Sequence, residues 1–254
     1  MMLLNRFLTF LTPALTGFAM LKMIWNPTDF VPWLLILLGV QIFTILKLSQ
    51  WKLRSRDTWA WLTLVVMFSA SMSAWMLILD YDIARYLVLG VTAVILLLFL
   101  DHLFDFLFAR ATYQSYSLEH ISRYMMLMTM FVTASAVFAA PLFLNISRLF
   151  ALGVGALLVF ILEMLSVWWL KLESAPTRQL LLTLYLCSVE LLWVLFFLPL
   201  HFYVNAMLVT FAFYLILNLG HYAATQSLSS AILKRYAGVG FLIFVLILAT
   251  AEWL

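Results

Sequence analysis

Two aspartates and a histidine stand inside a long apolar run, LLLFLDHLFDFLFAR, at positions 96–110. Asp101 and Asp105 are four residues apart, so both lie on one face of a helix, with His102 beside that face. Carboxylates and imidazoles placed inside a membrane bind cations or relay protons. Asp101, His102 and Asp105 are therefore candidates for a proton- or cation-binding site.

Later apolar segments contain three more such residues, Glu163, Glu190 and His221. At about 1.5 Å per residue, Asp105 lies roughly 7 Å, Glu163 roughly 12 Å and Asp101 roughly 13 Å inside the nearest polar loop. Glu190 lies near the middle of its segment, and His221 closes the end of the next one. We expect all six residues to line one polar pocket in the cytoplasmic half of the membrane.

Four of these six residues also have a purely structural interpretation. Asp105 then pairs with Arg110 at the membrane surface, and Glu163 meets the end of a neighbouring helix. Glu190 is then a neutral acid that is hydrogen-bonded to a serine or a tyrosine, and His102 makes an interhelical hydrogen bond. These alternatives differ from the pocket in giving each group its own separate partner.

The composition decides which solvent surrounds the protein. Of 254 residues, 67% are hydrophobic and only 10% are charged, whereas a soluble domain carries about a quarter charged residues. The chain is therefore predicted to lie in a lipid bilayer. No basic run is long enough to bind nucleic acid, so the net charge of +3 reflects loop residues. Cys187 is the only cysteine, which excludes an intrachain disulfide.

Polar breaks divide the chain into nine apolar segments of the length that crosses a bilayer. The predicted fold is an all-α, polytopic transmembrane bundle that forms one integral membrane domain over residues 1–254, without a soluble domain. The first segment is interpreted as a retained span, because no small-residue cleavage site ends it. Pro199-Leu200-His201 is interpreted as a break between two spans. The predicted spans are 7–24, 30–48, 58–79, 83–108, 124–143, 149–170, 179–198, 202–220 and 237–253.

The distribution of basic residues predicts the orientation. With the N-terminus in the cytoplasm, eleven of the fourteen lysines and arginines lie inside, and only Lys22, Arg85 and Arg148 lie outside. All tryptophans except Trp193 then fall near one of the two interfaces. We therefore expect a plasma (inner) membrane protein with a cytoplasmic N-terminus and an external C-terminus.

Two inner loops, 111–123 and 221–235, are amphipathic enough to lie on the membrane surface as short helices. They also share a Gln-Ser-x-Ser…Arg-Tyr pattern, in QSYSLEHISRY (114–124) and QSLSSAILKRY (226–236). This match predicts an internal repeat, in which one N-terminal helix is followed by four two-helix hairpins. The alternative is an accidental match between apolar segments that obey the same charge rule.

Several smaller patterns have structural interpretations. Rows of small residues, SASMSA (69–74) and TASA (133–136), together with Ala151 and Gly155, are typical of closely packed helix faces. The outer turn DYD (80–82) is interpreted as a helix-terminating turn rather than a divalent-ion site.

The pattern Asp101-x-x-x-Asp105, at the cytoplasmic end of a span, resembles an aspartate motif of the membrane prenyltransferases. That resemblance implies a magnesium ion and a pyrophosphate substrate. It covers five residues, and the second aspartate motif of that family is absent here, since Glu163 stands alone.

Three functions are compatible with these features. The favoured hypothesis is a small proton- or cation-linked transporter. The alternatives are a non-catalytic subunit or scaffold of a membrane assembly, and a membrane-embedded enzyme acting on a lipid or polyprenyl substrate. No common hydrolase, protease or nucleotide-binding motif occurs, which argues against an enzyme. The sequence does not indicate a cofactor. The predicted partner is the lipid bilayer, and the sequence is compatible with a homo-oligomer or a hetero-oligomer.

Overall fold

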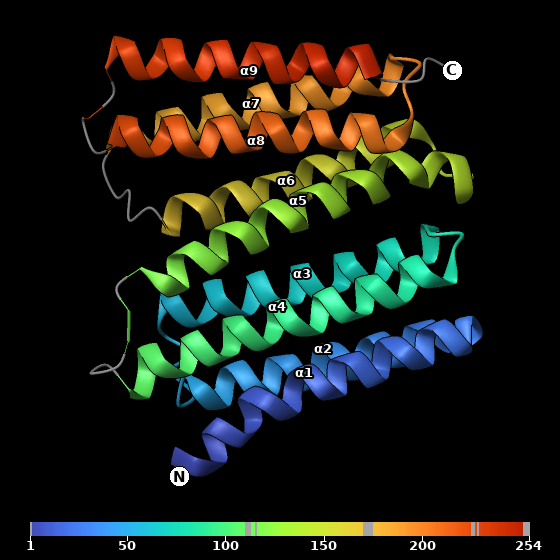
Figure 1. Ribbon diagram of the computed structural model, residues 1–254, viewed down its shortest axis with the longest axis vertical. Helices are drawn as coiled ribbons and strands as arrows, with labels where there is room; N and C mark the ends of the chain where they lie inside the picture. The colour runs from blue at the N-terminus through green and yellow to red at the C-terminus, as the bar shows by residue number, and fades with distance from the viewer. Residues whose placement is uncertain are drawn as a thin grey trace. The chain divides into compact units, whose positions relative to one another are not determined.

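The computed structural model contains nine α-helices and no strand within residues 2–109, 113–114, 116–169, 175–224, 227 and 229–250, which are the residues that it describes. The helices follow one another along the chain as long rods joined by short connections (Figure 1). A single 3₁₀ turn, η1 (Pro27–Asp29), joins the first two. The helices are α1 (Met2–Trp25), α2 (Phe30–Leu48), α3 (Arg56–Ile78), α4 (Asp82–Phe108), α5 (Ser117–Phe143), α6 (Arg148–Trp169), α7 (Ala175–Phe197), α8 (Phe202–Ala224) and α9 (Ser230–Thr250).

Eight of these helices are long and apolar enough to cross a membrane. The remaining helix, α7, occupies the place of the predicted span 179–198, but only Tyr185–Phe197 of it counts as an apolar helix among the described residues. The predicted all-α, polytopic class is therefore confirmed. The predicted break at Pro199-Leu200-His201 is confirmed as well, because α7 ends at Phe197 and α8 begins at Phe202.

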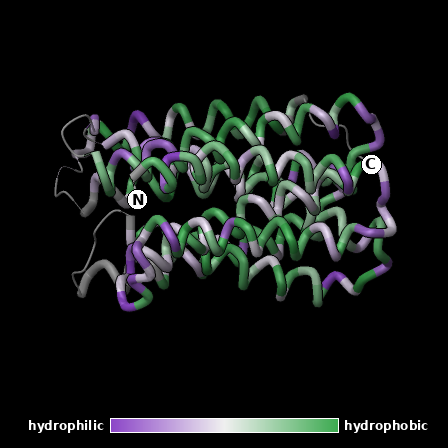
Figure 2. Tube along the Cα trace, turned by 90° about the horizontal axis from the view of Figure 1, so that it is seen from below, coloured by the Kyte–Doolittle hydropathy of each residue, from purple (hydrophilic) through white to green (hydrophobic). Residues whose placement is uncertain are grey.

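The hydrocarbon of the bilayer explains why the chain forms long helices. In hydrocarbon no water is available for the backbone, so each N–H and C=O group must bond within its own segment, as a helix allows. The most hydrophobic residues run along the middle of the helices, and hydrophilic residues gather toward their ends (Figure 2). Pro13 and Pro141 are both accommodated inside helices, as is common in membrane spans.

The chain divides into two compact units, which we describe separately as the N-terminal unit (Met1–Thr129) and the C-terminal unit (Met130–Leu254). In the N-terminal unit the first four helices form a closed ring. Helix α1 packs against α2 and α4, and α3 packs against α2 and α4 (Figure 1). Each of the four helices thus has two neighbours within the ring.

In the C-terminal unit, helices that follow one another along the chain pack together. Helix α7 packs against α6 and α8, and α8 packs against α9. The second half of α5 joins this unit through ring contact between Phe138 and Phe196, with centroids 4.7 Å apart, and through Val137, which lies against Gly155 of α6. Ala151 is buried on the same helix as Gly155, which confirms both as packing residues.

The prediction of separate surface helices at 111–123 and 221–235 was wrong for the described residues. Helix α5 already begins at Ser117 and continues into the span without a break. In the same way α8 continues to Ala224, and α9 begins at Ser230. The physical reason is that no glycine or proline separates Ser117 from the following apolar run, so the helix extends beyond the apolar segment.

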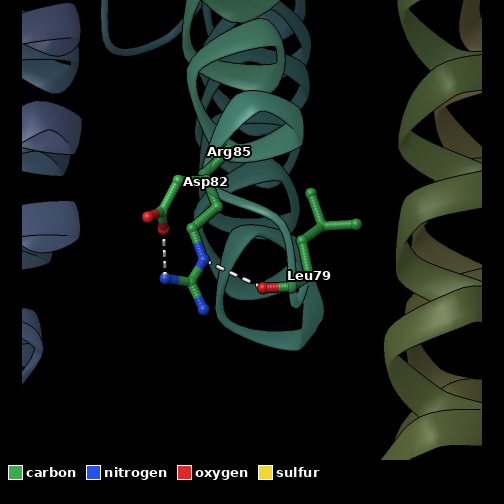
Figure 3. Close-up of polar contacts among 3 residues, drawn as sticks. All are labelled: Leu79, Asp82 and Arg85. Carbon is green, nitrogen blue, oxygen red and sulfur yellow. Dashed lines mark hydrogen bonds and ion pairs between the residues drawn. The ribbon is translucent and has the colours of Figure 1, made fainter.

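The turn between α3 and α4 is closed by Arg85 (Figure 3). Its Nε donates to the carbonyl oxygen of Leu79 at 2.9 Å, and its guanidinium forms an ion pair with Asp82 at 3.1 Å. Asp82 is also the first residue of α4, where a negative charge is favourable. The DYD segment therefore acts as the predicted helix-terminating turn.

The contact between α5 and α6 gives a matched test. A Cβ added to Gly155 would lie 2.8 Å from Cγ1 of Val137, whose χ1 is stiff in a helix, whereas a Cβ on Gly153 would meet nothing within 4 Å. We expect Gly155→Ala to destabilise the protein by about 1–3 kcal/mol through overpacking. Gly153→Ala should stabilise it by about 0.5–1 kcal/mol through helix propensity. Thermal unfolding in detergent compares the two variants, and equal melting temperatures would contradict this packing.

Candidate functional site

Glu163 is the most deeply buried acidic residue among those that the structure describes. It lies on α6 in the C-terminal unit and is only 1% exposed. The hydroxyl of Ser188 on α7 donates to Oε1 of Glu163 at 2.6 Å, and Ser166 donates to the backbone carbonyl of Glu163. The carboxyl group therefore links α6 and α7 through one of its two oxygens.

The second oxygen of this carboxyl group, Oε2, is buried and has no hydrogen-bond partner among the described residues. The structural alternative for Glu163, contact with the end of a neighbouring helix, does not describe this arrangement, because its partner is a mid-helix serine. A carboxyl group with one anchored and one unmatched oxygen has a fixed position and can still take up a proton or bind a cation.

Glu190 differs from Glu163 in its surroundings. It follows Ser188 by two residues on α7, so it points to another side of that helix, and it is exposed. The structure shows no hydrogen bond between Glu190 and a serine or tyrosine among the described residues, which is the partner that its structural alternative requires.

Asp101 is the corresponding acid of the N-terminal unit. It lies on α4 and is half-buried, and its Oδ1 is buried without a hydrogen-bond partner among the described residues. His102 and Asp105 lie on the same helix and are also half-buried. Arg110, the alternative partner of Asp105, lies outside the described residues.

The six predicted site residues are divided between the two units. Asp101, His102 and Asp105 belong to the N-terminal unit, and Glu163 and Glu190 belong to the C-terminal unit. The sixth, His221, lies on α8, and its side chain is outside the described part of the chain. The common pocket therefore stays a prediction. No group of three or more His, Cys, Asp or Glu side chains among the described residues is arranged to hold a metal ion.

Sequence reasoning missed a polar network in the N-terminal unit. Gln41 of α2 is fully buried, and its Nε2 donates to Ser69 of α3 at 2.7 Å and to Thr16 of α1 at 3.3 Å. The hydroxyls of Thr12 and Thr44 are hydrogen-bonded at 2.7 Å between α1 and α2. A lone glutamine in an apolar span, and threonines spaced by three and four residues on the preceding helix, are the pattern that would have indicated it.

Comparisons of the chain with protein-family models, with curated proteins and with solved structures give no match.

The hydrogen bond between Ser188 and Glu163 can be tested by removing its donor. We expect Ser188→Ala to destabilise the protein by about 1–3 kcal/mol, because Oε1 of Glu163 would then be buried without a partner. Ser166→Ala is the matched control and should cost less, since it removes a bond to a backbone carbonyl but leaves the carboxyl group anchored. The melting temperatures of the two variants measure this difference. A larger loss of stability for Ser166→Ala would refute the expected order.

Proposed function

We propose that the protein is a small proton- or cation-linked transporter. The observation that carries this proposal is a buried carboxyl oxygen without a partner in a membrane span of each unit, Oδ1 of Asp101 and Oε2 of Glu163. An ionised acid at the centre of a span costs about 2.5–3.5 kcal/mol on insertion scales. An acid kept at this cost, and only partly satisfied by the protein, is suited to exchange a proton or a cation.

The two carboxyl groups have different roles in this proposal. Ser188 holds Glu163 in place, so a proton or cation that arrives at Oε2 meets a positioned ligand and does not have to order a free side chain. Asp101 is half-buried and lies toward the predicted cytoplasmic end of α4, where it exchanges with the cytoplasm. His102 and Asp105 provide further exchangeable groups on the same stretch of helix.

A second candidate function, a subunit or scaffold of a membrane assembly, is favoured by α9. Only 6% of the apolar stretch of this helix is buried inside the protein, compared with 28–56% for the other seven candidate spans. Such a face is covered by lipid or by another chain. If flux is absent, α9 is the surface on which to look for an assembly partner.

Ion flux in proteoliposomes tests the transport proposal. We expect proton or monovalent-cation flux above that of empty vesicles for the wild type. Glu163→Gln keeps the shape of the side chain and an acceptor for Ser188, but it cannot exchange a proton, so flux should fall at least about tenfold, which corresponds to about 1.4 kcal/mol. Asp101→Asn should reduce flux in the same direction.

The control for this experiment is Glu119→Gln, which makes the same chemical change at the third residue of α5, in the segment that precedes the predicted span. Its flux should match the wild type. Background flux in the wild type would eliminate transport as the function. Loss of flux in Glu190→Gln alone would assign the site to the exposed acid instead of Glu163.

The proposed placement is a plasma (inner) membrane with the N-terminus in the cytoplasm, and the position of the C-terminus tests it. Nine crossings place the two termini on opposite sides, whereas eight crossings place them on the same side. We expect a C-terminal alkaline phosphatase fusion to be active and a C-terminal green fluorescent protein fusion to be dark. The opposite pair of results would contradict this placement. It would mean either that one helix does not cross, with α7 the first to examine, or that all nine helices cross in the reverse orientation.

A further inference from the structure

The helices of the N-terminal ring each contribute a buried polar residue at the same depth. These residues lie nine to eleven positions from Trp25, Phe30, Ile78 and Asp82, the helix ends at the α1–α2 and α3–α4 connections. This spacing is about 15 Å along each helix, which is half the thickness of the hydrocarbon. All four are at most 1% exposed. We call them the midplane polar layer: Thr16, Gln41, Ser69 and Thr92.

The amide of Gln41 is only half satisfied in this layer. Its Nε2 donates to Thr16 and Ser69, but Oε1 is buried and has no hydrogen-bond partner among the described residues. Rotating the amide by 180° does not remove the problem, because a hydroxyl can donate or accept. One end of the amide would then keep both hydroxyl partners, and the other end would still have none.

A second unmatched group lies close by on α3. Ser73 follows Ser69 by one helical turn, so the two share a face, and Ser73 is fully buried. Its hydroxyl has no hydrogen-bond partner among the described residues. Unmatched polar groups are costly in a low-dielectric interior, so two of them on facing helices indicate that another molecule satisfies them.

We propose that the midplane polar layer binds water, with the free end of the Gln41 amide as its principal ligand. A buried water makes two to four hydrogen bonds. The hydroxyl oxygens of Ser69 and Thr16 each accept one bond from Nε2 of Gln41, and each has a second lone pair. A cation fits this layer less well, because it has no counter-charge there. Asp101 is nine residues beyond Thr92 on α4, about 13 Å along the helix. The site is separate from Glu163 and does not depend on the transport proposal.

Water-edited solid-state NMR of the full-length protein in lipid bilayers tests this site. The measured quantity is the rate at which water polarisation reaches the side-chain amide of Gln41, assigned through its backbone resonances. The exposed Gln50 is the hydrated reference, and the methyl groups of Leu64, which is 0% exposed, are the dry reference. We expect Gln41 to receive polarisation severalfold faster than Leu64, at a rate close to that of Gln50.

A Gln41 rate equal to that of Leu64 in the wild type would overturn the proposal, so the result does not depend on whether any variant folds. Ser73→Ala provides a second measurement, and it should slow the transfer to Gln41 without changing that to Gln50. The proposal also fails if the Gln41 resonance shifts with sodium chloride but not with choline chloride, because the occupant would then be a cation.

Discussion

The requirement that every polar group in hydrocarbon find a partner governs this protein at each level. It makes the backbone helical, because the helix satisfies N–H and C=O groups within one segment. It also explains the side chains that hold the helices together, since three threonines, one serine and one glutamine bond across α1, α2 and α3. The buried groups without a hydrogen-bond partner among the described residues include Oε1 of Gln41, Oδ1 of Asp101 and Oε2 of Glu163, and at these groups we propose that water, a proton or a cation binds.

The two units meet this requirement in related ways. In each unit a long side chain on one helix bonds to a serine on the next helix, Gln41 to Ser69 and Glu163 to Ser188. Both serines lie nine residues before the end of their helix, at Ile78 and Phe197. The amide of Gln41 is permanently neutral, whereas the carboxyl group of Glu163 can exchange a proton. The interhelical hydrogen bonds of Gln41 are thus made by a group of fixed charge, and that of Glu163 is made by a group that can change its charge.

The sequence predicts those features of the fold that a local physical cause decides, and it does not predict those that depend on how the helices pack. The helical spans and the break at Pro199-Leu200-His201 were predictable, because a long apolar run or a proline decides the backbone locally. The length of α5 was not predicted, because the polar segment from Ser117 contains no glycine or proline and prolongs the helix. The serine partner of Glu163 and the exposure of Glu190 depend on the rotation of α6 and α7 about their axes, which no hydropathy pattern fixes. Gln41 was overlooked since a neutral amide is less conspicuous in a sequence than an acid, although here it is more completely buried than Asp101.

The closure of the first four helices into a ring has a consequence for biogenesis. Helix α1 packs against α4, which is made last of the four, so the ring cannot close until the ribosome has synthesised residues up to Phe108. At about 5–20 residues per second, α1 waits several seconds for this neighbour. During that interval the threonines of α1 already have their partners on α2, Thr44 and Gln41, whereas the side of α1 that packs against α4 has to wait for that helix.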